Sequence, residues 1–351
     1  MKTKTQKTQQ RFLAITAWVL LVCTLTFASC DNGGGTGTGT GHTHSYSTTW
    51  SFNATQHWKE CIANDGAKTG TANHTSNLCT VCGYDSLQNW TAVVDNTIWQ
   101  YTYNGVTYTN FINAVAYGNG RWVAGGEQGT MAYSDDNGET WTAVADSPFS
   151  SAIRAIAYGS DGNAVNKWVA GGDGGTMAYS DDNGETWTTV ADSPFSSDIR
   201  AIAYGNGRFV AVSYYGKEIA YSDDGESWTV QSSQLYILGI AYGNNRFVAV
   251  GWAESMDAKI AYSDDGESWT LVAENTFGMY SIYAIAYGNG KFVAGSWSYG
   301  RMAYSANGET WTAVTDSTFP SGSTGIIYAI AYGGGRFADS VDPAKMVYAN
   351  W

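Results

Sequence analysis

The sequence has little charge and especially little positive charge. Only 14% of its 351 residues are charged, against about 25% in an average soluble domain. Lys and Arg number 18 against 31 Asp and Glu, which gives a formal net charge of −13. This acidic balance argues against nucleic acid and anionic lipid headgroups as partners, because phosphate binding needs positive charge.

Proline, histidine and cysteine are also scarce. The chain has four prolines, and no histidine or cysteine occurs after residue 82. In contrast, 42 glycines, 15 tryptophans and 24 tyrosines are present. This composition predicts an all-β chain of many short strands joined by tight turns, and the low charge fits strands that are buried on both faces.

The N-terminus has the pattern of an export signal. Four basic residues precede an apolar run over residues 12–27, which is too short for a normal membrane span and predicts a secretory signal. Removing residues 1–29 leaves 14 Lys and Arg against 31 Asp and Glu, a net charge of −17.

The end of this run, Thr26-Phe27-Ala28-Ser29-Cys30, resembles a bacterial lipobox. The resemblance implies that Cys30 is lipidated and becomes the mature N-terminus. Two acyl chains would anchor the protein stably to the cell envelope, at the outer membrane or the cell surface. The membrane would then be contacted only through the anchor. The alternative is an ordinary signal cut near Ser29, which leaves a free thiol.

Residues 30–41 are expected to be a tether, because the Gly/Thr run over residues 33–41 has no side chains that could form a core. Residues 42–84 then hold all four histidines and three cysteines. Cys79-Thr-Val-Cys82-Gly83 is typical of a zinc knuckle, and the segment resembles a small zinc-ribbon-like module of bacterial surface proteins. The resemblance implies a structural zinc ion held by Cys61, His74, Cys79 and Cys82, with His57 as the alternative nitrogen ligand. A disulfide between Cys79 and Cys82, or one that involves Cys61, is the competing hypothesis, and neither is the third.

Residues 85–351 are expected to form one domain, and from Asn113 onward the chain repeats one unit. The pattern Ala-x-Ala-Tyr-Gly and its close variants recur six times, with spacings of 38 to 46 residues. Four short strands per period are typical of a propeller blade. We therefore predict a six-bladed β-propeller of four-stranded blades. In the fourth blade the strands are expected at residues 239–242, 246–250, 259–263 and 269–272. The segments 129–159 and 175–205 differ only at Ala143/Thr189 and Ala152/Asp198, so two units are near duplicates.

The sixth unit ends at Trp351 after three strands. An orphan segment before the first unit, Trp90-Thr-Ala-Val-Val94, matches the fourth strand of other blades. It is predicted to complete the last blade beside residues 346–349, which would remove an open sheet edge.

The turn between strands 3 and 4 carries a family resemblance. Ser134-x-Asp136-x-Gly138-x-Thr140-Trp141 and its copies are similar to Asp-boxes, also called BNR repeats, of sialidase-like propellers. The physical interpretation is structural: the carboxylate accepts turn amides, Gly takes a positive φ, and Trp packs in the fold. A calcium loop is the alternative, although the rest of that spacing is missing.

A binding site is expected where the copies disagree. The position just before strand 1, at the channel mouth, and the loop after the second strand vary among blades, on the face opposite to the Asp-boxes. The ligand-binding candidates are Arg154, Arg200, Tyr214, Trp252, Trp297, Tyr283 and Tyr328. Aromatic rings beside arginines suit sugar or peptide recognition.

These residues favour a non-catalytic, envelope-anchored binding module, with a monomeric propeller that takes a glycan or a surface or extracellular protein. No catalytic residue and no propeller cofactor is assigned. The resemblance to sialidases implies a glycoside hydrolase as one alternative, in which Arg154 and Arg200 would supply two of three arginines. A structural or assembly scaffold is the other alternative.

Overall fold

The structure is a computed structural model that describes residues 51–52, 56–60, 68–73 and 97–350, except for 161–165, 234, 256, 274–275, 298, 315–324, 334–335 and 342–344. The chain divides into two units, of which one contains residues 24–92 and the other most of the remaining chain. In the part of the chain described, no helix has the length and apolar character needed to cross a membrane.

The smaller unit contains one antiparallel sheet of β1 (Ser51–Phe52), β2 (Gln56–Glu60) and β3 (Lys68–Asn73). The predicted zinc ligands Cys61, His74, Cys79 and Cys82 lie outside the described residues, and so does the lipidation candidate Cys30.

Among its described residues, the larger unit contains a two-stranded hairpin and six further antiparallel sheets, five with four strands and the last with three. The first three are β6 (Ile112–Gly118), β7 (Arg121–Gly126), β8 (Met131–Ser134) and β9 (Thr142–Ala143); β10 (Ile153–Ser160), β11 (Asn166–Gly172), β12 (Met177–Ser180) and β13 (Thr188–Thr189); and β14 (Ile199–Gly205), β15 (Arg208–Ser213), β16 (Glu218–Ser222) and β17 (Thr229–Ser232). The others are β18 (Tyr236–Gly243), β19 (Arg246–Trp252), β20 (Ala258–Ser263) and β21 (Thr270–Leu271); β22 (Ile282–Gly288), β23 (Lys291–Ser296), β24 (Met302–Ser305) and β25 (Thr312–Ala313); and β26 (Ile327–Gly333), β27 (Arg336–Val341) and β28 (Lys345–Asn350). We call these sheets blades 1 to 6.

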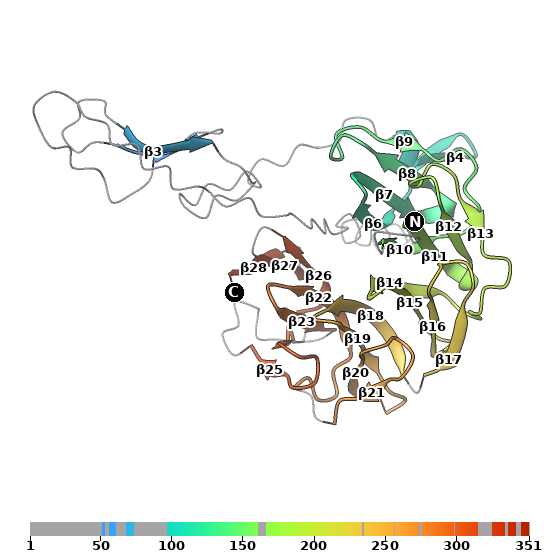
Figure 1. Ribbon diagram of the computed structural model, residues 1–351. Coiled ribbons are helices and arrows are strands. Elements are labelled where there is room, and N and C mark those ends of the chain that lie inside the picture. Colours follow the sequence, from blue (N-terminus) through green and yellow to red (C-terminus); the bar gives the residue numbers. More distant parts are fainter. Residues whose placement is uncertain are drawn as a thin grey trace, which may run out of the picture. The chain divides into compact units, whose positions relative to one another are not determined.

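The blades follow one another around a centre, as Figure 1 shows from β6 to β28. Their first strands contact each other in the order β6, β10, β14, β18, β22 and β26, so strand 1 of each blade is innermost. The predicted six-bladed propeller is therefore confirmed, with four strands in each of blades 1 to 5 and three described strands in blade 6. In blade 4 the inner strands are longer than predicted, and the outer strand β21 has only two residues.

The core consists of apolar layers between successive blades. One layer joins Val123 and Met131 of blade 1 to Ile153 and Trp168 of blade 2, and equivalent layers join each later pair up to blade 6. Blades 2 to 5 are thus buried on both faces, which explains the low charge content of the repeats.

The repeated Tyr-Gly pair at the end of strand 1 packs between blades. A Cβ atom at Gly243 would overlap the Tyr287 ring of the next blade, and the same overlap occurs at Gly118 with Tyr158, Gly159 with Tyr204, Gly205 with Tyr242, and Gly288 with Tyr332. Only glycine allows the next tyrosine to lie against the backbone. The Tyr-Gly repeat therefore reflects the close packing of neighbouring blades.

A hairpin that the sequence analysis did not identify precedes blade 1. It contains η2 (Thr97–Trp99), β4 (Gln100–Tyr103) and β5 (Val106–Thr109), with Asn104 and Gly105 in the positive-φ turn. Trp99 is buried against Ala124 and Ala132 of blade 1, whereas Tyr103 is 64% exposed. A two-residue Asn-Gly loop between Tyr- and Thr-rich runs predicts a β-hairpin. The alignment of the repeats did not identify it.

The last sheet has three described strands, as the sequence predicted, with β28 paired to β27. The segment 90–94, predicted to complete this blade, lies outside the described residues.

Candidate functional site

A β-bulge interrupts strand 1 of every blade at the same place. The pairing with strand 2 shifts between the first residue of the bulge and the residue two positions later. The residue between them has no partner across the ladder, and bulges of this kind redirect a side chain. The six bulge residues are Asn113, Arg154, Arg200, Leu238, Tyr283 and Tyr328, and we call them the bulge ring.

The bulge ring is the set of variable positions that the sequence placed at the channel mouth. The sequence analysis put these residues just before strand 1, whereas the structure includes them in the strand. The strand begins earlier because an apolar residue before each bulge is buried between blades, as with Ile199 and Ile282. The alternation of apolar and polar residues along the repeat did not by itself reveal the extra residue that forms the bulge.

The residue after strand 2 lies beside the bulge ring. In four blades its backbone N–H donates to the carbonyl two residues before the bulge residue: Glu127 to Phe111, Asp173 to Ala152, Tyr214 to Asp198, and Trp297 to Ser281. In blade 4, Trp252 pairs with Tyr236. Blades 1 to 5 therefore each present a pair of side chains at the same edge.

The pairs of blades 1 and 2 are polar. Asn113 Nδ2 donates to Glu127 Oε1 over 3.3 Å. Arg154 donates through Nε and Nη2 to both oxygens of Asp173, over 2.6 and 3.1 Å. Asp173 raises the pKa of Arg154 further above its usual value, and Glu127 and Asp198 act in the same direction. Arg154 is therefore neutralised by its own blade.

The pairs of blades 3 and 4 combine a cation with aromatic rings. Arg200 Cζ lies 5.8 Å from the centre of the Tyr214 ring. Tyr236 lies between Tyr214 and Trp252, with ring centres 6.4 and 4.9 Å away. Burial raises the pKa of Tyr214, and the neighbouring hydroxyls of Tyr215 and Tyr283 add to this. Because Tyr283 belongs to blade 5 and acts on Tyr214, the aromatic residues of blades 3 and 4 lie near the blade 5 part of the bulge ring.

The pair of blade 5 is aromatic and extends to blade 6. The ring centres of Tyr283 and Trp297 are 4.8 Å apart, and Tyr328 meets both edge-on at 6.2 and 6.0 Å. Trp297 remains 42% exposed. An exposed ring supported by two others is a rigid apolar contact surface.

The structure thus gathers the seven candidate residues around one edge, although their surroundings differ. Sequence reasoning missed Tyr236, and it missed Lys217, which lies over the Tyr236 ring at 4.6 Å and pairs with Glu254 at 2.5 Å. Phe149 and Phe195, in the connections between blades, are 6% and 7% exposed and belong to the layers between blades.

The Asp-box turns lie at the opposite edge and are internally satisfied. In blade 1, Ser134 Oγ donates to Asp136 Oδ1 at 2.8 Å and accepts from Gly138 N at 2.9 Å. Asp136 also accepts from Thr140 N, and Trp141 Nε1 donates to Gly138 O. In blade 5, Asn307 Oδ1 takes the place of the carboxylate. The turn is therefore built from hydrogen bonds that an amide can also make.

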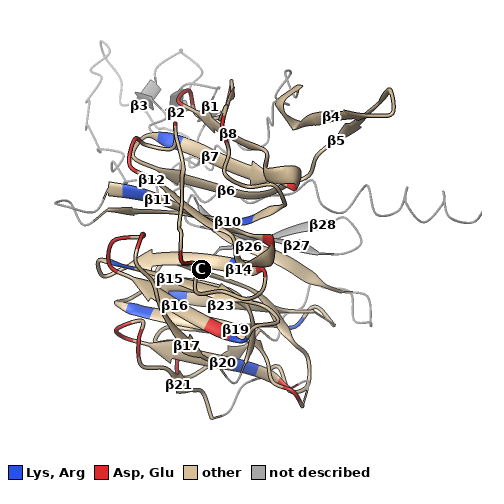
Figure 2. Ribbon diagram, turned by 90° about the vertical axis from the view of Figure 1, so that its right-hand side faces the viewer, with Lys and Arg blue, Asp and Glu red and all other residues tan. Residues whose placement is uncertain are grey.

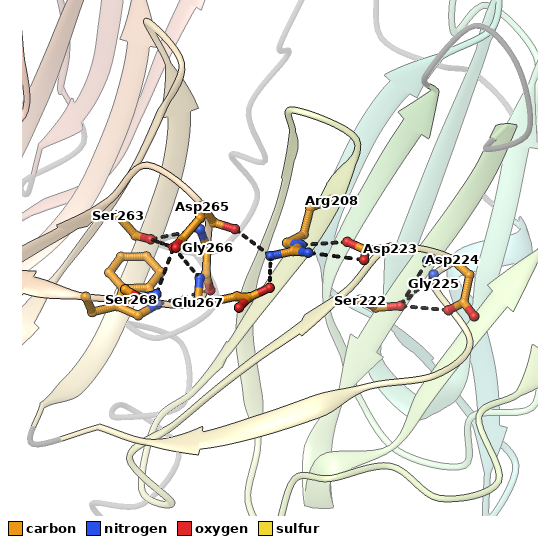
Figure 3. Close-up of polar contacts among 11 residues, drawn as sticks. Arg208, Ser222, Asp223, Asp224, Gly225, Ser263, Asp265, Gly266, Glu267 and Ser268 are labelled. Carbon is orange, nitrogen blue, oxygen red and sulfur yellow. Dashed lines mark hydrogen bonds and ion pairs between the residues drawn. The ribbon is translucent and has the colours of Figure 1, made fainter.

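The same turns join neighbouring blades through ion pairs. Arg208 of blade 3 binds Asp223 of its own turn and reaches Asp265 O at 2.8 Å and Glu267 at 2.5 Å in blade 4 (Figure 3). Arg121, Lys167 and Arg246 make equivalent links to Glu185, Glu226 and Glu309. Figure 2 shows basic strand ends beside acidic turns along one edge of the blades. The acidic residues that make these links are thus already paired within the propeller.

The residues described contain no cluster of three or more His, Cys, Asp or Glu side chains that could hold a metal ion. In blades 1 to 4 the paired Asp residues of the turn bind serine, backbone amides and a basic residue instead, as Asp264 and Asp265 show.

No protein-family model matches the sequence, and no curated protein matches it. Solved structures do match the fold. The chain is similar to YCF48 bound to D1 peptide, at 16% identity and TM-score 0.53, with 85% of this chain and 89% of that chain covered. It is similar to catalytically inactive virginiamycin B lyase from Staphylococcus aureus with quinupristin, at 11% identity and TM-score 0.57, over 87% and 97%. The computationally designed Ika8 protein matches at 13% identity and TM-score 0.52, over 89% and 98%.

These likenesses define the chain as a β-propeller with four-stranded blades, the architecture that the blade pairing shows independently. Identities this low establish the fold alone, and fold does not determine function.

Proposed function

We propose that this chain is an exported, lipid-anchored binding protein whose propeller takes a protein partner through the bulge ring without catalysing a reaction. The observation that carries the proposal is the contrast between the two edges. At the Asp-box edge, equivalent residues make the same contacts in successive blades. At the bulge ring the pairs change from Asn113–Glu127, through Arg200–Tyr214, to Tyr283–Trp297, while the backbone stays the same. A constant scaffold with varied side chains at one edge suits recognition.

A peptide segment of a protein is the ligand we favour. YCF48, whose structure was solved with a peptide, supports this because it shares the propeller architecture. Aromatic anchors such as Trp297 are typical of protein interfaces. Glycan binding by the same aromatic rings is one alternative function, and a passive assembly scaffold is the second alternative.

A hydrolase is less well supported. A sialidase-like site uses three arginines, and Asp173 already neutralises Arg154. The similar lyase is described with a histidine replaced in its inactive form, and the sequence after residue 82 contains no histidine. The described acids of the Asp-boxes are occupied by turn amides and ion pairs.

The proposal is tested with the full chain purified in detergent, on a random heptapeptide array and a glycan array. We expect a subset of peptides to bind, and Trp297→Ala to weaken their binding about tenfold or more. Tyr103→Ala is the matched control, because Tyr103 is an exposed aromatic residue outside the ring. Absence of peptide binding would overturn the proposal. Glycan binding lost in Trp297→Ala would favour the glycan alternative, and turnover of a fluorogenic sialoside would favour the hydrolase.

The anchor is tested in cells. Inhibition of signal peptidase II should make the unprocessed precursor accumulate, and Cys30→Ser should abolish the mobility shift. The prediction rests on the lipobox resemblance of residues 26–30. Unchanged gel mobility in the presence of the inhibitor would contradict lipidation.

The structural zinc ion expected in residues 42–84 is tested by elemental analysis of the full chain together with a thiol count. One zinc ion per chain, lost in the Cys79→Ser variant, is the expected result. A disulfide without metal would contradict it.

A further inference from the structure

The near-duplicate segments place two arginines at equivalent bulge positions with different surroundings. Arg154 uses Nε and Nη2 to bind both oxygens of Asp173. The guanidinium of Arg200, which is half-buried, makes no hydrogen bond or ion pair with any residue that the structure describes. Its one recorded neighbour is the Tyr214 ring, 5.8 Å away.

The difference arises where the duplication ends. The copied segment stops at Gly205, and the residue after strand 2 is Asp173 in blade 2 but Tyr214 in blade 3. The backbone places both residues alike: Asp173 N donates to Ala152 O over 2.9 Å, and Tyr214 N donates to Asp198 O over 3.1 Å. The replacement of an acid by tyrosine at this position therefore leaves Arg200 without its carboxylate.

A guanidinium with five N–H donors and no acceptor favours an anion, and its planar fork matches a carboxylate in particular. The Tyr214 face orients the cation without neutralising it. Next to it, the rings of Tyr214, Tyr236 and Trp252 form a continuous row with centres 6.4 and 4.9 Å apart. The surroundings thus offer one cationic position beside an apolar one.

We propose that Arg200 binds a carboxylate of the peptide partner and that the Tyr214 and Tyr236 rings pack against an apolar or aromatic group next to that carboxylate. This inference rests on the proposed function and narrows it to acidic–aromatic peptide segments. The carboxylate belongs either to an Asp or Glu side chain or to a free C-terminus, which present the same chemistry. Arg154 takes no part in this recognition, because its guanidinium is already paired with the carboxylate of Asp173.

The test uses the full chain on random heptapeptides that are synthesised twice, with a free and with an amidated C-terminus. We expect the bound peptides to be enriched in Asp and Glu beside aromatic residues, or to bind only with a free C-terminus. The two forms of the array distinguish these sources. Replacing Glu by Gln in a bound peptide, or Arg200 by Gln in the protein, should weaken binding about tenfold or more.

A second variant keeps Arg200 but gives its guanidinium a carboxylate partner within the protein. Tyr214→Asp rebuilds the arrangement of Arg154 with Asp173, so the preference for acidic peptides should be lost. Tyr214→Phe keeps the ring and should keep the preference. Lys259→Gln, at a lysine of β20 whose side chain makes no hydrogen bond or ion pair with the residues described, controls for the loss of one positive charge. Circular dichroism melts confirm that each variant folds.

Peptide binding without an acidic preference, or equal binding by Arg200→Gln, would overturn this inference and leave the proposed function intact. Absence of peptide binding would overturn both. Arg200-dependent binding of acidic glycans but not of peptides would show that the carboxylate belongs to another class of ligand, and would also overturn it.

Discussion

Arg208 of blade 3 and Glu267 of blade 4 form an ion pair across the boundary between the two blades, with Nη1 2.5 Å from Oε1 (Figure 3). Arg208 also binds Asp223 of its own blade, and this contact contributes most to the raised pKa of the arginine. One side chain therefore fixes the turn of its own blade and positions the turn of the next.

Removing the ion pair between Arg208 and Glu267 should weaken the contact between blades 3 and 4. We expect Glu267→Gln to lower the free energy of unfolding by about 0.5–1 kcal/mol, since both groups are partly exposed and the pair is screened. The melting temperature should fall by about 2–4 °C. The matched control is Asp192→Asn, because Asp192 is an exposed acid outside the turns whose side chain has no partner among the described residues. Equal effects of the two substitutions would contradict the role of the ion pair.

Two glycines with similar φ angles separate backbone strain from packing. Gly266 and Gly290 both have φ of +75°, but a Cβ at Gly266 would meet Val210 Cγ2 at 2.8 Å, whereas nothing lies within 4 Å at Gly290. Gly290→Ala should cost about 1–2 kcal/mol from the positive φ alone. Gly266→Ala should cost about 1–3 kcal/mol more from overpacking. Chemical denaturation measures both values, and equal costs would show that the contact between blades is not tight.

Stability should fall in acid because of the Asp-box carboxylates. The hydrogen bonds from the Thr140 side chain and backbone lower the pKa of Asp136 from 3.8 to about 2. The pKa values of Asp182, Asp224 and Asp265 are also lowered, because the hydrogen bonds of the turn outweigh the opposing effect of burial.

A carboxyl group whose pKa is lower in the folded state stabilises the fold above its unfolded pKa. This stabilisation is lost as the pH falls from about 4 to about 2. The melting temperature should drop over this range, and the drop should be smaller in Asp136→Asn. Asn307 already makes the equivalent bonds in blade 5, so the substitution should fold. Asp146→Asn, at an exposed acid outside the turns, is the control; if it reduced the drop as much, the turns would not be the cause.

Blade 6 should depend on residues before blade 1. Deleting residues 86–95 removes the segment predicted to pair with β28, whose six residues would then keep one edge open. We expect the melting temperature to fall by more than about 5 °C, since several backbone hydrogen bonds and an apolar layer are lost. Deletion of residues 33–41 from the tether should leave it unchanged. An unaltered melt of the 86–95 deletion would refute closure by this segment.

The sequence by itself determined the period, the number of blades and the three strands of the last unit. It also determined the chemistry of the Asp-box turns. These features are local: strand alternation, and a Ser, Asp and Gly within a few residues of one another, act through neighbouring atoms of the same chain segment.

Only the tertiary structure decided which side chains meet across strands and blades. The bulge that directs Arg200 to the channel mouth, the reach of Arg208 to Glu267, and the packing of Tyr287 on Gly243 depend on strand register and on the spacing of blades. Arg154 and Arg200 have equivalent positions in the duplicated segments, and their surroundings differ because Asp173 and Tyr214 come from the segment after strand 2. A repeat pattern specifies the shape of a unit, but the neighbours of a side chain are set by the packing of one unit against the next.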